Sequence, residues 1–66
     1  MHTREEFDRK VREFLAGPYA APWPGIRLGP SVTNNPDEDI WMQEADCDDG
    51  PLPLILYHGE IYVEEC

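Results

Sequence analysis

The C-terminal third of the chain contains the pattern that most constrains the fold. Two short runs rich in β-branched and aromatic residues, 54–57 and 60–63, flank the dipeptide His58-Gly59. A two-residue turn between antiparallel strands needs positive φ at both central positions, which glycine adopts freely and histidine tolerates. The spacing therefore predicts a β-hairpin with a defined register. One face of it would carry four apolar residues: Leu54, Leu56, Ile61 and Val63. The other face would carry a mixed set: Ile55, Tyr57, Glu60, Tyr62 and Glu64.

The N-terminal segment predicts an amphipathic helix over residues 4–16. Thr3 is a candidate N-cap, and Glu6, three residues later, completes a capping box. Apolar residues recur at i, i+4, i+7 and i+8 and form one stripe: Phe7, Val11, Phe14 and Leu15. Gly17 is expected to end the helix in the left-handed conformation, because Pro18 forbids its continuation.

The central part of the chain predicts a connector followed by two strands. Residues 17–25 contain three prolines, which exclude a helix and an interior strand. Residues 26–28 are expected to form a short strand that Gly29-Pro30 interrupts. Whether residues 31–33 continue this strand past a bulge stays open. A turn then precedes a strand over 40–45, and 46–53 is expected to be a loop.

These elements predict one α+β domain over residues 1–66. It would have two layers, with the helix packed on a three- to four-stranded antiparallel sheet over 26–65. One helix covers only one face of a sheet, so the second face would expose Ile55, Tyr57 and Tyr62, with Trp41. Two alternatives remain open for this face. Either the Pro-rich connector folds over it through Trp23, or a partner protein covers it.

The distribution of charge narrows the kind of partner. All five Lys and Arg lie before residue 30, whereas residues 30–66 carry ten acidic residues and no Lys or Arg. With a net charge of −9, the chain should repel nucleic acid and anionic lipid, and a basic protein surface is its natural complement. The acidic runs are expected along one rigid edge of the sheet. The candidate charge carriers are Asp37, Glu38, Asp39, Asp46, Asp48 and Asp49, and the candidate apolar anchors are Trp41, Tyr57 and Tyr62.

Other chemistries fit the sequence poorly. A calcium loop beginning at Asn35 would have Ile40 where glycine is required, and one beginning at Asp46 reaches its glycine one residue early. The cysteines and histidines lack the short spacing of a structural zinc site. The single serine lies in no triad-like context, and 66 residues cannot easily wall a catalytic cleft. We therefore expect no enzymatic activity, no metal and no cofactor.

Composition also suggests a cellular location. No run of about 18 apolar residues is present, and the charged N-terminus does not resemble a signal peptide, so a cytoplasmic protein without membrane contact is expected. Two cysteines are too few for a secreted disulfide scaffold and suit free thiols. A bridge between Cys47 and Cys66 stays open as an alternative.

The functional hypothesis is a small acidic module that binds a basic, nucleic-acid-handling protein. Its most concrete form is a nucleic-acid mimic that inhibits such a protein by occupying its groove. In size and charge, though not in any motif, the chain is similar to the small inhibitors that phages use against host defence, including anti-CRISPR proteins. The alternative is a homo-oligomeric assembly protein that pairs through the exposed aromatic sheet face. The first hypothesis predicts a monomer, which we favour, and the second predicts a dimer.

Overall fold

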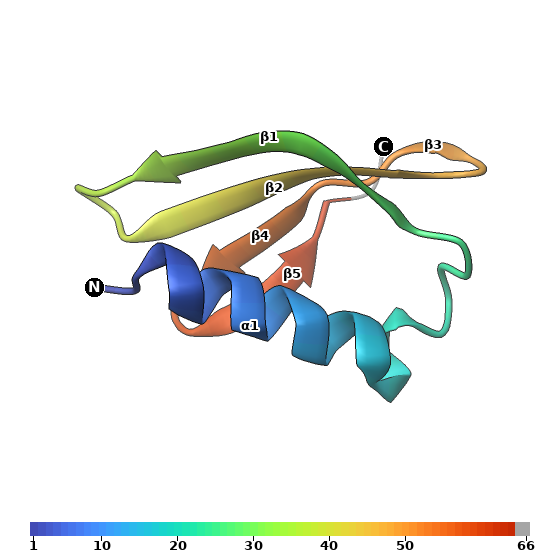
Figure 1. Ribbon diagram of the computed structural model, residues 1–66, viewed down its shortest axis with the longest axis horizontal. Helices are drawn as coiled ribbons and strands as arrows, with labels where there is room; N and C mark the ends of the chain where they lie inside the picture. Colours follow the sequence, from blue (N-terminus) through green and yellow to red (C-terminus); the bar gives the residue numbers. More distant parts are fainter. Residues whose placement is uncertain (65–66) are drawn as a thin grey trace.

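The structure, a computed structural model, describes residues 1–64. One helix precedes a five-stranded antiparallel sheet, so the predicted α+β class is confirmed. In chain order the elements are α1 (Arg4–Ala16), the short 3-10 helix η1 (Pro18–Ala20), β1 (Arg27–Asn35), β2 (Ile40–Cys47), β3 (Gly50–Pro51), β4 (Leu54–Tyr57) and β5 (Glu60–Val63). The strand order is β1-β2-β4-β5, with β3 paired to the end of β2 (Figure 1).

The helix begins as the sequence predicts and ends differently. The Glu6 N–H donates to Thr3 Oγ1 at 3.1 Å, and the Thr3 N–H donates to Glu6 Oε1 at 3.0 Å, which completes the capping box. These hydrogen bonds from Thr3 lower the pKa of Glu6. The prediction that Gly17 adopts the left-handed conformation is wrong, because its φ is −98° and its ψ is 179°. A residue before proline is restricted to extended conformations, and Pro18 then opens η1, where its missing N–H is not needed.

The sheet confirms the predicted hairpin and corrects the loop before it. β4 and β5 pair Leu54 with Val63 and Leu56 with Ile61. The turn between them has φ of 51° at His58 and 79° at Gly59. Residues 31–33 do continue the strand, because β1 runs past Gly29-Pro30 with a register shift between Leu28 and Val32. β1 and β2 both end beyond the predicted strands. Residues 46–53 are not one loop, because β2 continues to Cys47 and β3 pairs back onto it.

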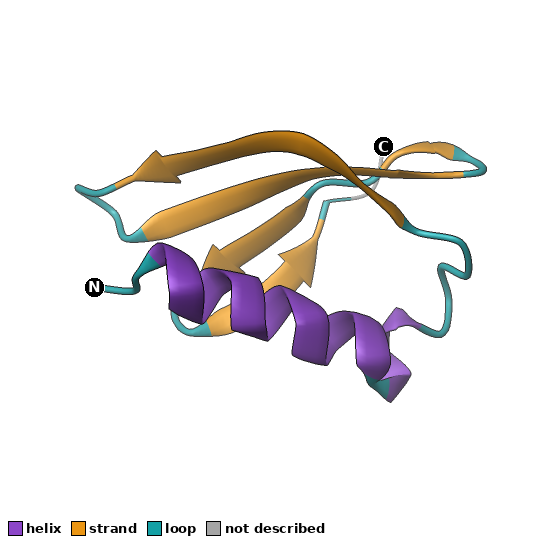
Figure 2. Cartoon of the chain, in the orientation of Figure 1, coloured by secondary structure: helices purple, strands orange, loops and turns teal. Residues whose placement is uncertain are grey.

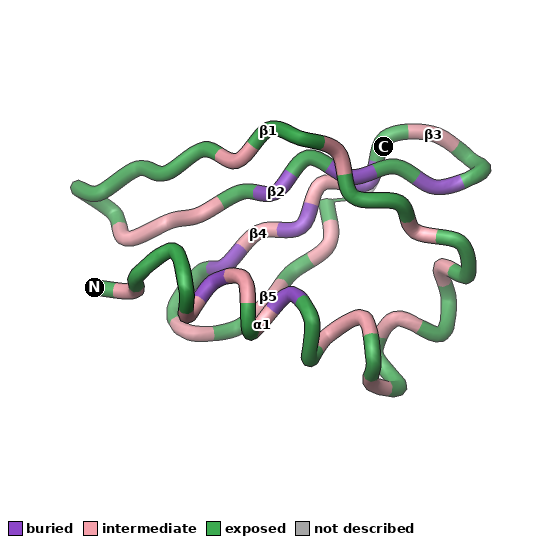
Figure 3. Tube along the Cα trace, in the orientation of Figure 1, coloured by how far each residue is buried: buried purple, intermediate pink, exposed green. Residues whose placement is uncertain are grey.

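The core lies between α1 and one face of the sheet. Its buried residues are Phe7, Val11, Ala45, Leu54 and Leu56. Figure 3 shows that these positions occur where α1, β2 and β4 face one another. The C-terminal half of the helix stripe, Phe14 and Leu15, is only partly buried. The helix therefore covers the β4–β5 side of the sheet and leaves β1 mostly exposed. Within residues 1–64 no helix is long and apolar enough to cross a membrane.

Candidate functional site

The sheet has a core face that packs on α1 and an outer face that points away from it. Residues directly opposite one another on paired strands share a face. Met42 pairs with Ile55, and Ile55 pairs with Tyr62, so these three side chains lie together on the outer face. We define the outer face by its central residues: Thr33, Met42, Glu44, Asp46, Ile55, Tyr57, Glu60 and Tyr62.

The centre of the outer face is apolar and accessible. Tyr62 is 49% exposed, Tyr57 is 41% exposed and Met42 is 36% exposed. The rings of Tyr57 and Tyr62 lie 6.4 Å apart, and the Tyr62 hydroxyl donates to Glu60 Oε2 at 3.3 Å. A pocket of about 250 Å³ opens between β1, β2 and β4, and Ile40, Met42 and Ile55 form its apolar wall. Exposed aromatic rings on an apolar surface are typical of protein-binding sites.

The Pro-rich connector does not cover this face. Its aromatic residues lie on the helix side of the sheet, where Tyr19 and Trp23 line a groove together with Phe14 and Val63. Figure 2 shows the connector running from the end of α1 to β1 without crossing the outer face. The alternative in which Trp23 packs on the second sheet face is therefore wrong. Nothing in residues 1–64 covers the outer face.

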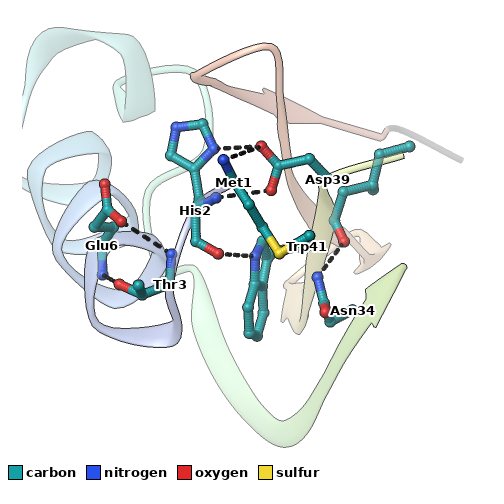
Figure 4. A network of polar contacts seen from close by, with 8 residues as sticks. Met1, His2, Thr3, Glu6, Asn34, Asp39 and Trp41 are labelled. Carbon is teal, nitrogen blue, oxygen red and sulfur yellow. Dashed lines mark hydrogen bonds and ion pairs between the residues drawn. The ribbon is translucent and has the colours of Figure 1, made fainter. Parts of the chain in front are cut away.

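Trp41 does not belong to the outer face, and its expected exposure there is wrong. It pairs with Leu56, a core residue, and its ring stacks on Phe7 with centroids 5.7 Å apart. Its Nε1–H donates to the His2 carbonyl at 3.1 Å (Figure 4). The alternation within 40–47 placed Trp41 and Met42 on opposite faces. Only the pairing of β2 with β4 decided which of them meets the helix.

The acidic runs do not form one continuous edge, which corrects the expected arrangement. Asp37, Glu38 and Asp39 lie in the turn between β1 and β2, whereas Asp48 and Asp49 follow β2. Figure 1 shows these two turns at opposite ends of the long axis of the molecule. The strand β2, which is eight residues and roughly 23 Å long, lies between them. The outer face therefore lies between two acidic ends.

Asp39 is engaged by the N-terminal segment. Its carboxylate accepts hydrogen bonds from the His2 N–H at 2.8 Å and lies 2.9 Å from His2 Nδ1 (Figure 4). The Met1 amino group lies 4.0 Å away. The bond from the His2 backbone, followed by the one from its side chain, lowers the pKa of Asp39. Asp39 adopts a φ of 53°, and it joins the turn to the residues that precede α1. It is therefore a structural contact as well as a surface charge.

Two carboxylates at the other end of β2 are paired with Arg27. The guanidinium donates to Asp46 Oδ1 at 2.9 Å and to Asp48 Oδ1 at 3.1 Å. The hydrogen bond to Asp48 and the charge of Asp46 raise the pKa of Arg27. The remaining predicted charge carriers make no ion pair within residues 1–64: Asp37, Glu38 and Asp49.

Sequence reasoning missed two residues of the outer face. Met42 and Glu44 alternate with the buried Gln43 and Ala45, and this alternation was the signal that could have found them. Glu44 Oε2 accepts a hydrogen bond from the Ser31 N–H at 3.1 Å, so its carboxylate spans the bulge of β1. The outer face therefore has an acidic residue beside its apolar centre on β2, as well as Glu60 on β5.

Other candidate chemistry is not assembled. Within residues 1–64 no group of three or more His, Cys, Asp or Glu side chains could hold a metal ion. Cys47 is a buried free thiol. Cys66, the other cysteine of the alternative bridge, lies outside the described residues.

The outer face is thus the main candidate site: an apolar centre on β2, β4 and β5 with carboxylates around it. Comparison with protein-family models, with curated proteins and with solved structures finds no match for the chain. A functional proposal therefore rests on the composition and geometry of this face.

Proposed function

We propose that the chain is a small acidic binding protein, without catalytic activity, that docks its outer face on a basic surface of a nucleic-acid-binding protein. The observation that carries the proposal is the exposure of Met42, Tyr57 and Tyr62 beside Glu44 and Glu60. A large apolar area supplies affinity once water is excluded, and the surrounding carboxylates select a basic partner.

The separation of charge between the two layers supports a basic partner. The helix carries four basic and four acidic side chains, whereas residues 27–66 carry Arg27 and ten acidic residues. Arg27 is already bound to Asp46 and Asp48. The outer face therefore has an excess of negative charge that the helix, on the far side of the sheet, does not neutralise. Such a field steers a cationic protein toward the face and accelerates association.

The most concrete form of the proposal is mimicry of a nucleic acid. Carboxylates at both ends of β2 and along the outer face would contact the Lys and Arg residues with which the partner binds phosphates. The module would then inhibit the partner by competing with its nucleic acid. An inhibitor directed by a phage against a host defence protein is one instance of this activity.

The first test is capture from a cell lysate at low salt, with two matched variants. Tyr57→Ser/Tyr62→Ser removes the aromatic anchors of the outer face. The control Leu28→Ser alters an exposed apolar residue on β1 that is outside this face. A basic nucleic-acid-binding protein recovered with wild type and the control, but not with the double variant, would support the proposal. The purified partner should then release a labelled duplex DNA or RNA as wild-type chain is added. Equal recovery with both variants, or simultaneous binding of chain and nucleic acid, would contradict it.

A second test separates location from total charge. Asp37→Lys/Glu60→Lys reverses two exposed charges on the sheet side, and Glu5→Lys/Glu13→Lys makes the same net change on the helix. With the captured partner, the sheet-side variant should lower the association rate at low salt by about tenfold or more. The helix-side variant should have a much smaller effect. An affinity that stays constant from low to high salt would argue against mimicry.

The apolar centre of the outer face also favours a second candidate, a homodimer that pairs through this face. Self-association would bring two equally acidic surfaces together, so we place this candidate below the first. Light scattering at increasing concentration distinguishes them. A monomer at all concentrations fits the inhibitor, and a dimer that Tyr57→Ser/Tyr62→Ser dissociates fits the assembly protein.

A further inference from the structure

The free edge of β5 presents backbone hydrogen-bonding groups that no other part of residues 1–64 pairs. β5 is the last strand of the sheet and pairs only with β4. The two-residue turn directs the backbone groups of Glu60 and Tyr62 toward β4. The same orientation recurs two residues further on, because the Glu64 N–H donates to the carbonyl of Pro53, the residue before β4, at 3.0 Å. The N–H and C=O groups of Ile61 and Val63 therefore point away from the sheet.

A groove of about 610 Å³ runs along this edge on the core side. Its walls come from α1, the connector and β5. The aromatic residues that line it are Phe14, Tyr19, Trp23 and Tyr62, and Lys10 and Glu13 of α1 also line it. Tyr19 is 77% exposed. An additional strand would direct every second side chain to the same side as Ile61 and Val63. Those side chains would enter the groove and contact its aromatic lining.

The opposite edge of the sheet is obstructed. The register of β1 shifts between Leu28 and Val32, and Pro30 within this bulge has no N–H to donate. The N–H of Ser31 already donates to Glu44. Bulges, prolines and charged side chains are the devices by which sheet edges avoid pairing with other chains. β5 has a regular backbone and an apolar groove beside it, so the two edges differ in their capacity to accept a strand.

Charge along β5 indicates which strand it would accept. Pairing with a second copy, with Ile61 opposite Val63 of that copy, would place Glu60 opposite Glu64 at both ends of the contact. Like charges directly opposite one another destabilise a strand pair, whereas opposite charges stabilise it. A second copy is therefore disfavoured. A segment with basic residues at these two positions is favoured.

We propose that the free edge of β5 binds, by strand addition, an extended segment of a partner protein with the pattern basic–apolar–any–apolar–basic. The two basic residues would lie opposite Glu60 and Glu64 on the outer side of the sheet. The two apolar residues would lie opposite Ile61 and Val63, exchange backbone hydrogen bonds with them and fill the groove. The central residue would lie beside Tyr62. This site is the free edge of β5, which the outer-face proposal does not use, although the two sites share the side chains of Glu60 and Tyr62.

The test uses the full chain and a synthetic peptide, acetyl-Ser-Lys-Val-Thr-Val-Lys-Ser-amide, with binding measured by calorimetric titration. N-methylation of either valine amide removes a hydrogen bond to β5, so the Kd should rise at least about tenfold. N-methylation of the threonine amide, which points away from β5, should change the Kd less than about threefold. The proposal would be overturned if N-methylation of the threonine raised the Kd as much as N-methylation of a valine, or if the parent peptide did not bind at millimolar concentration.

A charge exchange provides the control for specificity. Glu60→Lys/Glu64→Lys should weaken binding of the parent peptide and restore binding of a peptide with both lysines replaced by glutamate. In the wild-type complex, hydrogen exchange of the Ile61 and Val63 amides should slow, while the Tyr19→Ser variant should bind the peptide more weakly. Two results would count against strand addition. One is that the Glu60→Lys/Glu64→Lys chain does not bind the glutamate peptide, and the other is that the hydrogen-exchange rates of the Ile61 and Val63 amides do not change.

Discussion

The two faces of the sheet are made from alternate residues of the same strands, yet they differ in nearly every property. On β2 the side chains of Gln43, Ala45 and Cys47 are buried, whereas Met42, Glu44 and Asp46 are exposed. In the first set, Ala45 joins Phe7 and Val11 of α1 in the core, and Gln43 Nε2 donates to the Gly29 carbonyl at 2.8 Å. The second set stays exposed: the side chains of Glu44 and Asp46 bond to residues of β1, Ser31 and Arg27, and no helix covers this face within residues 1–64. The difference shows that strand periodicity separates side chains into two groups, and that the position of a single helix decides which group becomes the core.

The largest expected effect comes from removing equivalent apolar side chains on the two faces. Leu56→Ala removes a residue with 0% exposure and should lower the free energy of unfolding by about 2–5 kcal/mol. Because a chain of this size has a total stability of only a few kcal/mol, this variant should be largely unfolded at 25 °C. Met42→Ala, on the outer face, should cost less than about 1 kcal/mol. Urea titration followed by circular dichroism measures both, and equal losses would show that the faces are not distinct.

Trp41 provides a sharper test of which face is the core. Trp41→Phe keeps an aromatic ring near Phe7 and removes the Nε1–H donor to the His2 carbonyl. The loss of this partly buried hydrogen bond should lower the free energy of unfolding by roughly 1–2 kcal/mol. Tyr57→Phe is the control on the outer face and should change stability by less than about 0.5 kcal/mol. If Trp41→Phe left the free energy of unfolding unchanged, the hydrogen bond from Trp41 to the His2 carbonyl would not stabilise the fold.

Gly29 tests the contact of an outer-face carboxylate with the bulge of β1. A Cβ at Gly29 would lie 2.6 Å from Glu44 Oε2, so Gly29→Ala should displace the Glu44 side chain from the Ser31 N–H. We expect a loss of about 1 kcal/mol. In a Glu44→Ala background the same substitution should cost much less, because the displaced group is absent. Additive effects in this double-mutant cycle would show that Glu44 does not hold the bulge.

The smallest expected effect concerns Asp39, in the turn between β1 and β2, whose contribution to stability depends on pH. Because the contacts with His2 lower the pKa of Asp39 below its ordinary value of about 4, ionised Asp39 stabilises the folded chain. This contribution is present at neutral pH and is lost as the pH falls through the lowered pKa.

At pH 7, Asp39→Asn should therefore lower the melting temperature relative to wild type. The difference should shrink as the pH falls below 4. Asp37→Asn, whose side chain makes no ion pair within residues 1–64, is the matched control and should have little effect at any pH. If the difference in melting temperature between Asp39→Asn and wild type stayed constant across this pH range, ionised Asp39 would not be the source of the stabilisation.

Local pattern was sufficient for the elements whose geometry depends on neighbouring residues. The bounds of α1 and its capping box follow from Thr3, Glu6 and the apolar stripe, and the hairpin register follows from His58-Gly59. Gly17 shows the limit of this reasoning, because the constraint that Pro18 imposes on it outweighs the usual preference for a left-handed cap.

The candidate site was less predictable. Tyr57 and Tyr62 were assigned to the correct face because the hairpin fixes their orientation locally. Trp41 was assigned to the wrong face, because its orientation depends on the pairing of β2 with β4, which are separated by a turn and β3. The bonds of Asp39 to His2 and of Arg27 to Asp46 and Asp48 join residues distant in sequence, and no local pattern indicates them.

By itself, the amino-acid sequence determined the helix, the terminal hairpin and the excess of acidic residues after Arg27, since each depends on composition or on residues a few positions apart. The tertiary structure decided which sheet face stays exposed, which carboxylates are already bound and which edge remains open for pairing. Those outcomes depend on contacts between strands and termini that are distant in the chain. Their free energy comes from packing and hydrogen bonds that form only when the whole fold is assembled.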